Sequence, residues 1–378
     1  MLALDNARVL LDGAFRTDVS VVIEGRHIVG VVAADDVPAA ASRRDLAGAR
    51  LVPGFIDTQV NGGGDALFND DPSVETIRRI GAAHASFGTT GFLPTLISDD
   101  LDVVRAGIAA VDDAIAQGVP GVLGIHIEGP FINVERKGIH AAGKIRAIDE
   151  DGYAVLASLK RGRTLVTLAP EVTGPAMVAR LAAAGVLVSA GHTAGSFDAI
   201  TAAIDAGLTG FTHLFNAMSQ LGNREPGAVG AALVDPRVWC GVIVDGHHVS
   251  PVTLRLALKC KPLDRFMLVT DAMPPTGGTR SEFQLNGEIV RVDGERLVNA
   301  SGTLAGAELN MMRAVKNTID LLGVSPADAF AMASANVATF LGLSDELGHI
   351  AVGSRASLVA VKDDGTLIAS WIDGATMM

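Results

Sequence analysis

A repeated strand-then-helix pattern constrains the fold of this 378-residue chain more than any other feature. Short apolar runs end in small or polar residues, and Ala-rich stretches of helical character follow them. Alternation of this kind predicts parallel strands joined by crossover helices. Eight such strands close most economically into a (β/α)8 TIM-type barrel, and an open doubly wound sheet is the alternative. The predicted strands cover residues 51–57, 90–95, 122–127, 164–169, 186–190, 210–213, 240–244 and 266–270.

The two ends of the chain have a different texture, with short alternating runs separated by turns. Residues 1–50 and 345–378 are therefore predicted to form one small β-sandwich domain. Residues 51–344 are predicted to form the barrel domain. Within the barrel, residues 274–304 are Gly-rich and carry short alternating runs, which predicts a β-hairpin insertion. The expected fold class is α/β, a barrel with a small sandwich built from both chain ends.

Charge and cysteine content argue against several classes of protein. Lys and Arg total 30 and Asp and Glu total 42, a formal net charge of −12, so a nucleic-acid-binding surface is not expected. Cys240 and Cys260 lie in apolar surroundings without a CxxC spacing, which is typical of a reducing compartment. The N-terminus lacks the basic and apolar regions of a secretion signal, and the longest uncharged stretches are too short to span a bilayer. We expect a cytoplasmic protein with no membrane or nucleic-acid partner.

Side chains with metal-binding chemistry stand at the ends of three predicted strands. Glu128 follows the third strand, His192 follows the fifth, and His213 is the last residue of the sixth. The C-terminal strand ends of a barrel face one mouth, so these residues are expected to meet there. Two imidazoles and a carboxylate suit a borderline divalent ion such as zinc and leave positions open for water. Each histidine taken alone favours a structural, hydrogen-bonded role, whereas the set at successive strand ends favours a metal site.

Asp271 follows the eighth predicted strand, in the segment LVTDAM. An unpaired carboxylate inside a barrel is energetically expensive, so this residue requires a partner or a chemical role. One interpretation is a salt bridge to a basic residue below it. The other is a general base beside the metal, which takes a proton from water and delivers it to a leaving group.

Six segments together resemble a known family. They are LVPGFIDTQVNGGGDALFND, GIHIEGPF, SAGHT, FTHLFNAM, VDGHHV and LVTDAM, in this order along nearly the whole chain. They resemble the N-acetylglucosamine-6-phosphate deacetylase family of the amidohydrolase superfamily. PGFID alone indicates only the superfamily, whereas HIEGP combined with THLFNAM is far more selective.

The resemblance implies one divalent metal ion per subunit, held by Glu128, His192 and His213. Zinc is the expected ion, and iron(II), manganese and cobalt are the alternatives because the same ligands accept several ions. Many superfamily members have an HxH pair after the first strand, where this chain has Gln59-Val60-Asn61. An amide binds a divalent cation less well than imidazole does. A weaker second ion near Gln59 or Asn61 therefore stays an open alternative.

The resemblance also implies roles in catalysis and substrate binding. Asp271 corresponds to the catalytic acid and base, and His140 in KGIHAAG to the histidine that polarises the carbonyl. A solvated loop residue is the alternative for His140, and a plain surface charge is the alternative for Arg224. The family implies a homodimer in which Arg224 and His248 reach the site from the neighbouring subunit. His247 receives no role. The residues expected to bind the sugar phosphate are His140, Asn216, Ala217, Arg224 and His248.

The implied reaction is removal of the acetyl group from N-acetyl-D-glucosamine 6-phosphate, giving D-glucosamine 6-phosphate and acetate. Such a reaction belongs to amino-sugar catabolism and cell-wall recycling. One alternative keeps the barrel and metal but acts on a cyclic amide or an aminated base, although relatives of that kind usually retain the HxH pair. Another alternative is a non-catalytic scaffold, for which loss of ligands is the expected mark. The motifs do not distinguish the epimers of the sugar.

Overall fold

A computed structural model describes residues 1–377, and its centre is a barrel of eight parallel strands. Neighbouring strands follow chain order, and a parallel bridge between Val60 and Ala272 joins the first strand to the segment after the last. The predicted (β/α)8 barrel is confirmed. Its strands are β8 (Phe55–Val60), β11 (Thr89–Leu96), β12 (Gly124–Glu128), β13 (Arg163–Leu168), β14 (Leu187–Ala190), β15 (Gly210–Phe211), β16 (Trp239–Val242) and β17 (Phe266–Leu268).

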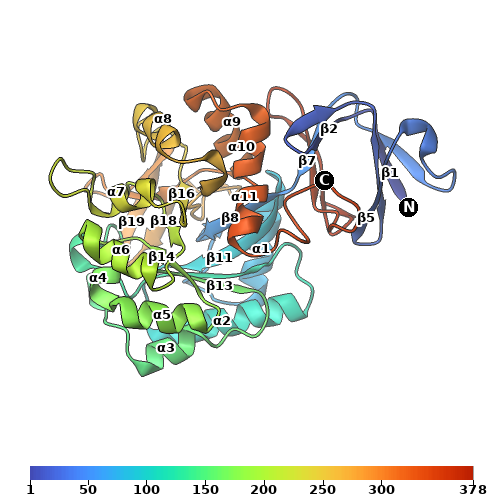
Figure 1. Cartoon of the computed structure of the whole chain (residues 1–378). Helices are drawn as coiled ribbons and strands as arrows, with labels where there is room; N and C mark the ends of the chain where they lie inside the picture. The colour runs from blue at the N-terminus through green and yellow to red at the C-terminus, as the bar shows by residue number, and fades with distance from the viewer. Residues whose placement is uncertain (378) are drawn as a thin grey trace.

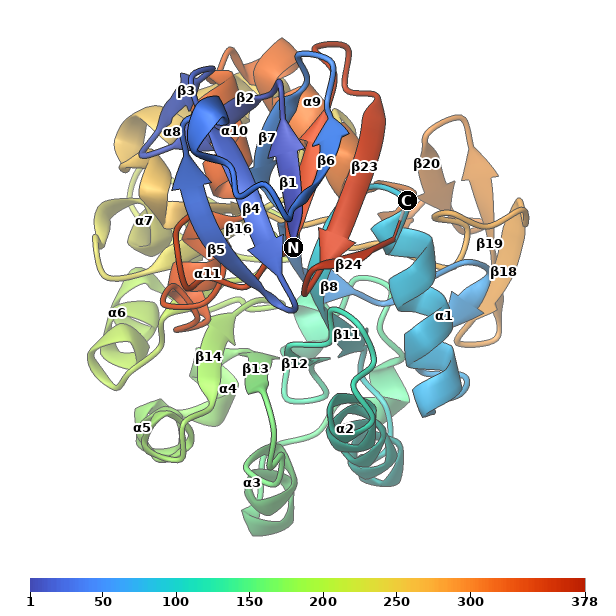
Figure 2. The same ribbon diagram turned by 90° about the vertical axis from the view of Figure 1, so that its right-hand side faces the viewer.

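Helices surround the barrel, as the two views in Figures 1 and 2 show. Side chains cap several of them: Ser73 accepts a hydrogen bond from the Thr76 N–H, and Ser250 and Ser325 precede a proline in the first helical turn. The helices are α1 (Val74–Ala85), α2 (Leu101–Ala116), α3 (Glu150–Leu156), α4 (Pro170–Thr173), α5 (Pro175–Ala183), α6 (Phe197–Asp205), α7 (Gly227–Val234), α8 (Pro251–Cys260), α9 (Met311–Leu322), α10 (Pro326–Met332) and α11 (Ala335–Phe340). The 3-10 turns are η1 (Ala34–Asp36), η2 (Val134–Arg136), η3 (Ala142–Lys144) and η4 (Leu263–Arg265). No helix among residues 1–377 is both long and apolar enough to cross a bilayer.

The two ends of the barrel differ in polarity. At the N-terminal end, Ile56, Leu93 and Leu123 belong to an apolar cluster that Phe340 of α11 joins. One step nearer the mouth, the buried His126 lies 2.9 Å from the Thr58 carbonyl oxygen. Burial of apolar side chains at the N-terminal end stabilises the barrel. The C-terminal end can therefore carry polar groups without loss of this core.

Segments from both chain ends form two further sheets that share a core including Leu4, Val9 and Trp371. This β-sandwich lies beside the barrel (Figure 1), which confirms that part of the fold class. The predicted limits 1–50 with 345–378, and 51–344, stay predictions. One sheet contains β1 (Leu2–Asp5), β4 (Ser20–Glu24), β5 (His27–Val32) and β6 (Ser42–Asp45). The other contains β2 (Arg8–Leu11), β3 (Ala14–Arg16), β7 (Arg50–Pro53), β22 (Leu358–Val361), β23 (Leu367–Ile372) and β24 (Ala375–Thr376).

The structure divides the apolar run 51–57, predicted as one strand, into two strands. β7 pairs with β22 in the terminal sheet, and β8 begins two residues later in the barrel. Gly54 lies at the junction, where an added Cβ would be only 2.0 Å from the Thr90 hydroxyl oxygen. The close approach of the Thr90 side chain to this backbone explains the glycine.

The insertion near residues 274–304 is larger than a hairpin. It is a four-stranded antiparallel sheet, and its last strand returns to the barrel through a bridge between Ala307 and Ala272. The side-chain amide of Asn286 donates a hydrogen bond of 2.9 Å to the carbonyl oxygen of Ile139, so the insertion contacts the long β12–α3 loop. The strands are β18 (Glu282–Leu285), β19 (Glu288–Asp293), β20 (Arg296–Val298) and β21 (Leu304–Ala307), and a small hairpin, β9 (Gly62–Gly63) and β10 (Ala66–Leu67), lies nearby in sequence after β8.

Candidate active site

A cavity of about 240 Å³ gathers most of the predicted site residues at the C-terminal strand ends. Gln59 does not line it but donates hydrogen bonds to residues that do. Arg224 is exposed on the β15–α7 loop, away from the cavity. The predicted residues that line the cavity are Asn61, Glu128, His140, His192, His213, Asn216, Ala217, His248 and Asp271.

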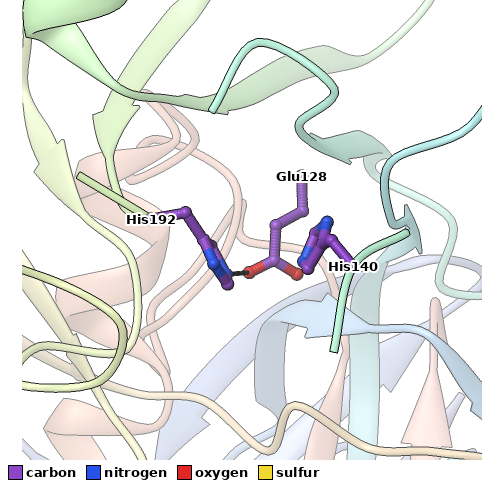
Figure 3. Close-up of side chains that lie close together, drawn as sticks. All are labelled: Glu128, His140 and His192. Carbon is purple, nitrogen blue, oxygen red and sulfur yellow. Dashed lines mark hydrogen bonds and ion pairs between the residues drawn. The ribbon is translucent and has the colours of Figure 1, made fainter. Parts of the chain in front are cut away.

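Three predicted metal ligands converge on one point. Glu128 ends β12, while His192 and His213 come shortly after β14 and β15. Glu128 Oε1 lies 3.1 Å from His192 Nε2 and 2.9 Å from His213 Nε2, and the two nitrogens are 3.1 Å apart. Figure 3 shows the Glu128 carboxylate between His192 and His140. All three ligands are buried, so their lone pairs meet in a space that protein atoms enclose.

The donor set fits a divalent cation. His192 Nδ1 lies 2.8 Å from the Arg136 carbonyl oxygen, which fixes the proton on Nδ1 and leaves the Nε2 lone pair facing Glu128. Burial alone would raise the pKa of Glu128, but hydrogen bonds and charge from His192 and His213 lower it well below its ordinary value. Tetrahedral bonds of zinc length place neighbouring ligand atoms about 3.3 Å apart, close to the spacing here.

Two amide side chains contact Asp271, and one of them also contacts the predicted ligand Glu128. The Gln59 amide nitrogen lies 3.2 Å from each Glu128 oxygen and 3.1 Å from Asp271 Oδ1, and the Asn61 amide donates to the same Asp271 oxygen at 2.7 Å. Burial, and then the charge of Glu128, raises the pKa of Asp271 to about 6. No salt bridge joins Asp271 to a basic residue within 1–377, so the geometry favours the chemical role over the ion-pair interpretation.

The amides of Gln59 and Asn61 bear on the second ion. Their nitrogens face carboxylate oxygens and donate hydrogen bonds to them. A flipped amide would instead place its oxygen against a carboxylate oxygen, and the two oxygens would repel. The Gln59 N–H groups thus bridge Glu128 and Asp271 with partial positive charge. The Asn61 amide oxygen is buried without a hydrogen-bond partner among the described residues. A weaker ion at Gln59 or Asn61 stays a prediction.

His140 is buried against Ser98 and His192 rather than solvated. Its Nδ1 accepts a hydrogen bond of 3.2 Å from the Ser98 backbone N–H and lies 2.7 Å from the Ser98 hydroxyl. An acceptor Nδ1 requires the proton to be on Nε2, so this neutral ring presents a donor. Burial, and then the charge of His192, lowers the pKa of His140 to about 3. His140 also offers a ligand atom within 4.8 Å of those of Glu128 and His192.

His248 lines the cavity of its own chain. Its expected arrival from a neighbouring subunit, like the homodimer itself, stays a prediction. Asp245 orients the ring: its carboxylate lies 2.6 Å from His248 Nδ1 and accepts the backbone N–H groups of residues 247 and 248. The bend that these bonds stabilise turns His248 inward. His247 instead lies 3.7 Å from Glu295 of the insertion.

Sequence reasoning missed part of the cavity wall. The insertion was predicted, but its contribution to the cavity was not, because no pattern in residues 274–304 indicates which segment they cover. The apolar Ile97, directly after β11, was also not predicted to line the cavity. The missed lining residues include Ile97, Ile139, Met273, Thr303, Leu304 and Gly306.

Comparison with known proteins places the chain in a family. The amidohydrolase family model matches residues 50–377. The chain belongs to the amidohydrolase family. It is 41% identical to the N-acetylgalactosamine-6-phosphate deacetylase of Shewanella sp. (strain ANA-3) over 377 residues, covering 99% of this chain and 95% of the relative. It is 32% identical to the N-acetylglucosamine-6-phosphate deacetylase of Haemophilus influenzae over 360 residues, covering 94% of each.

A solved structure gives the same result for this amidohydrolase. The crystal structure of N-acetylglucosamine-6-phosphate deacetylase from Pasteurella multocida matches with a TM-score of 0.96 and 32% identity, covering 99% of each chain. The resemblance that the sequence motifs indicated is confirmed, as is the expectation of a hydrolase.

Proposed function

We propose that this amidohydrolase removes the acetyl group from an N-acetylhexosamine 6-phosphate, such as N-acetyl-D-glucosamine 6-phosphate, and releases acetate. One observation carries the proposal. Glu128, His192, His213 and Asp271 surround one cavity, and the Gln59 amide nitrogen touches both carboxylates. An amide bond placed there meets a base, a hydrogen-bond donor and a metal-binding cluster together.

One divalent ion per subunit would be held by Glu128, His192 and His213, with zinc as the first choice and iron(II), manganese or cobalt as alternatives. When bound, such an ion lowers the pKa of water and polarises a carbonyl group. A non-catalytic scaffold is expected to have lost metal ligands, whereas all three predicted ligands are present in this cluster. The geometry therefore supports an enzyme over a non-catalytic relative.

Asp271 would move the proton. Its pKa of about 6 leaves most molecules ionised at neutral pH, so the carboxylate can accept a proton from the attacking water. The Gln59 and Asn61 amides fix one of its oxygens, which orients the carboxylate. The protonated Asp271 then donates the same proton to the departing nitrogen, and the amine leaves while acetate forms.

His140 and His248 would act on opposite ends of the substrate. The neutral His140 ring donates from Nε2 to the acetyl oxygen, where negative charge develops. His248 and Asn216 line the same cavity and offer donors to the sugar phosphate. Ala217 would contribute backbone groups, as expected from the motif.

Acetate release tests this proposal directly. We expect release from N-acetyl-D-glucosamine 6-phosphate, loss of release after chelation, and recovery when zinc is added back. The unphosphorylated sugar serves as the matched control, and its kcat/KM is expected to be lower. Turnover of a cyclic amide or an aminated base in place of both sugars would favour the alternative amidohydrolase function. Absence of bound metal, with no rescue by zinc, would favour a scaffold.

The galacto epimer is a second candidate substrate. The relative from Shewanella is 41% identical and is named for N-acetylgalactosamine 6-phosphate, whereas the relative from Haemophilus, named for the gluco epimer, is 32% identical. The ratio of the two kcat/KM values decides between them. A ratio above one for the galacto sugar assigns that epimer as the substrate, and a ratio below one assigns the gluco epimer.

We also propose a homodimer in which Arg224 reaches the partner's cavity. Arg224 is exposed in the single chain, and Leu221 beside it and Val234 at the end of α7 are 58% and 67% exposed, a surface that a second copy would cover. Mixing Arg224→Ala with Asp271→Asn tests this. In a shared-site dimer, about a quarter of the sites regain both residues. If the activity of the mixture is no greater than the sum of the activities of the two separate variants, the shared site is contradicted.

Location in the cytoplasm is a further proposal. Cys240 is buried and Cys260 is exposed, and both are free thiols in the structure. Free thiols are compatible with a reducing compartment. Fractionation of cells that produce the protein is the measurement that checks this.

A further inference from the structure

Glu171 binds together two segments of the site without lining the cavity. It lies in α4, two residues after the buried Ala169. One carboxylate oxygen accepts hydrogen bonds from the Asn133 side-chain amide at 2.9 Å and from the Ala194 backbone N–H at 2.7 Å. The other accepts from the hydroxyl of Thr193. One half-buried carboxylate therefore satisfies three donors from two distant parts of the chain.

The first of these segments is the β12–α3 loop, residues 129–149, which carries His140. It already touches the segment that carries His192, because the Asn133 N–H donates to the His192 carbonyl oxygen at 2.9 Å. His192 Nδ1 in turn lies 2.8 Å from the Arg136 carbonyl oxygen. The orientation of the His192 ring thus depends on where this loop lies.

The second segment is residues 191–195, which follows β14. His192 has a φ of 48°, a left-handed conformation that is strained for a histidine. Strain of this kind persists only where surrounding contacts hold it. Thr193 and Ala194, directly after His192, are the residues whose groups Glu171 accepts. The Thr193 N–H also donates to the Ala217 carbonyl oxygen at 3.1 Å, which extends the connection to the substrate side.

We propose that Glu171 is a positioning residue that holds His192 in its metal-binding orientation and holds the β12–α3 loop against it. Its carboxylate makes charge-assisted bonds, which are stronger than neutral ones. Without it, residues 192–194 can relax and the Arg136 carbonyl can move away from His192. The inference rests on the proposed metal site, since positioning has a measurable meaning only if Glu128, His192 and His213 bind an ion.

The test measures zinc affinity of the metal-free chain by competition with a chelator, independently of any substrate. Glu171→Gln keeps the shape but removes the charge, and we expect the zinc dissociation constant to rise by about tenfold or more. The unfolding temperature of the metal-free variant should stay close to that of the matched control Asp65→Asn. Asp65 is also a half-buried carboxylate that accepts from a threonine hydroxyl and two backbone N–H groups, at Thr279 and Arg280, but away from the metal ligands.

Thr193→Val is the second variant, in case Glu171→Gln does not fold. It removes one donor to Glu171 and should weaken zinc binding in the same direction, and the double variant should lose less than the sum of the two losses. Zinc affinity within twofold of the parent chain in Glu171→Gln or, if that variant does not fold, in Thr193→Val would overturn the positioning role. Failure of the parent chain to bind zinc would overturn the metal site itself, and with it this inference. Unchanged zinc binding in the variant with intact acetate release leaves the proposed function standing alone.

Discussion

The terminal sheets and the barrel mouth both contain residues in the left-handed region, but of different kinds. In the terminal sheets they include Asn6, Asp12 and Asp373, with φ values of 52°, 47° and 51°. Asn and Asp tolerate this conformation in turns because their short side chains bond to nearby backbone. Such residues are placed by local turn chemistry and cost little.

At the barrel mouth the left-handed residues include those proposed to carry the chemistry. His192, His213 and Asp271 have φ values of 48°, 35° and 53°. Histidine lacks the short side-chain oxygen by which Asn and Asp bond to the backbone of their own turn. Strain of this kind persists where tertiary contacts hold it, such as the bond from the Ala194 N–H to Glu171 near His192, and all three side chains line the cavity. The same backbone conformation is thus a turn device in one region and an aiming device in the other.

The largest difference between the two regions is expected in turnover, when one left-handed aspartate in each region is replaced by asparagine. Asp271→Asn should lower turnover by about 10²- to 10⁴-fold, because one group supplies both base and acid. Metal content should be nearly unchanged, since Asp271 is not among the proposed ligands. Asp12→Asn, in an exposed turn, should leave turnover at the parent value. Steady-state acetate release with elemental analysis checks both, and near-normal turnover of Asp271→Asn would refute the assignment.

The next effect compares a buried carboxylate with a half-buried one that has different partners. Glu128→Gln should weaken zinc binding by more than about 100-fold, because a direct ligand counts for more than the residues behind it. Asp373 instead accepts two hydrogen bonds from Arg355, at 2.6 and 2.9 Å. Asp373→Asn should lower the free energy of unfolding by about 1–3 kcal/mol and leave zinc affinity unchanged.

Chelator competition and urea unfolding measure these two outcomes on the same samples. Equal zinc affinity in Glu128→Gln and the parent chain would remove Glu128 from the metal site. A change in the zinc affinity of Asp373→Asn would show that the terminal sheets influence the barrel mouth, contrary to the expected independence of the two regions.

The residues at strand ends were predictable because a barrel brings them together. Once the eight-strand pattern is recognised, Glu128, His192, His213 and Asp271 must face one mouth, whatever the loops do. The break at Gly54 was not predictable, since the apolar run continues through it while the pairing partner changes from β22 to β11. Apolar pattern indicates burial but not which sheet a strand joins.

The orientation of the predicted side chains could not be read from the sequence. The tautomer of His140 depends on a backbone N–H of Ser98, 42 residues away in the chain. His192 Nδ1 bonds to the Arg136 carbonyl in another loop, and the nearby Ala194 N–H bonds to Glu171 in α4. Contacts of this kind leave no periodicity, and loop sequences carry few signals of their tertiary partners.

A pH profile of the metal-free protein should distinguish the regions by sign. The pKa of Asp271 is raised to about 6, so its stabilising contribution is present below the unfolded-state pKa of about 3.9 and is lost as pH rises through about 6. Burial raises the pKa of Asp373, but Arg355 lowers it below its ordinary value, so its contribution is lost on acidification. Urea unfolding should therefore show that Asp271→Asn makes the gain in stability between about pH 7 and about pH 5 smaller by the share that Asp271 contributes. An unchanged profile in that variant would contradict the shift.

The smallest effect comes from a matched pair of alanines. Ala47 in the terminal region and Ala217 at the mouth have φ values of 51° and 47°. Replacement by glycine relieves left-handed strain of about 1–2 kcal/mol and restores chain entropy costing about 0.5–1 kcal/mol, so each variant should gain up to about 1 kcal/mol of unfolding free energy. Only Ala217→Gly should also raise KM, because it loosens a segment that lines the cavity. If both glycine variants keep the parent KM, the left-handed conformation at Ala217 has the same local turn role as that at Ala47. The difference between the two regions is then limited to the residues proposed to bind the metal and to transfer the proton.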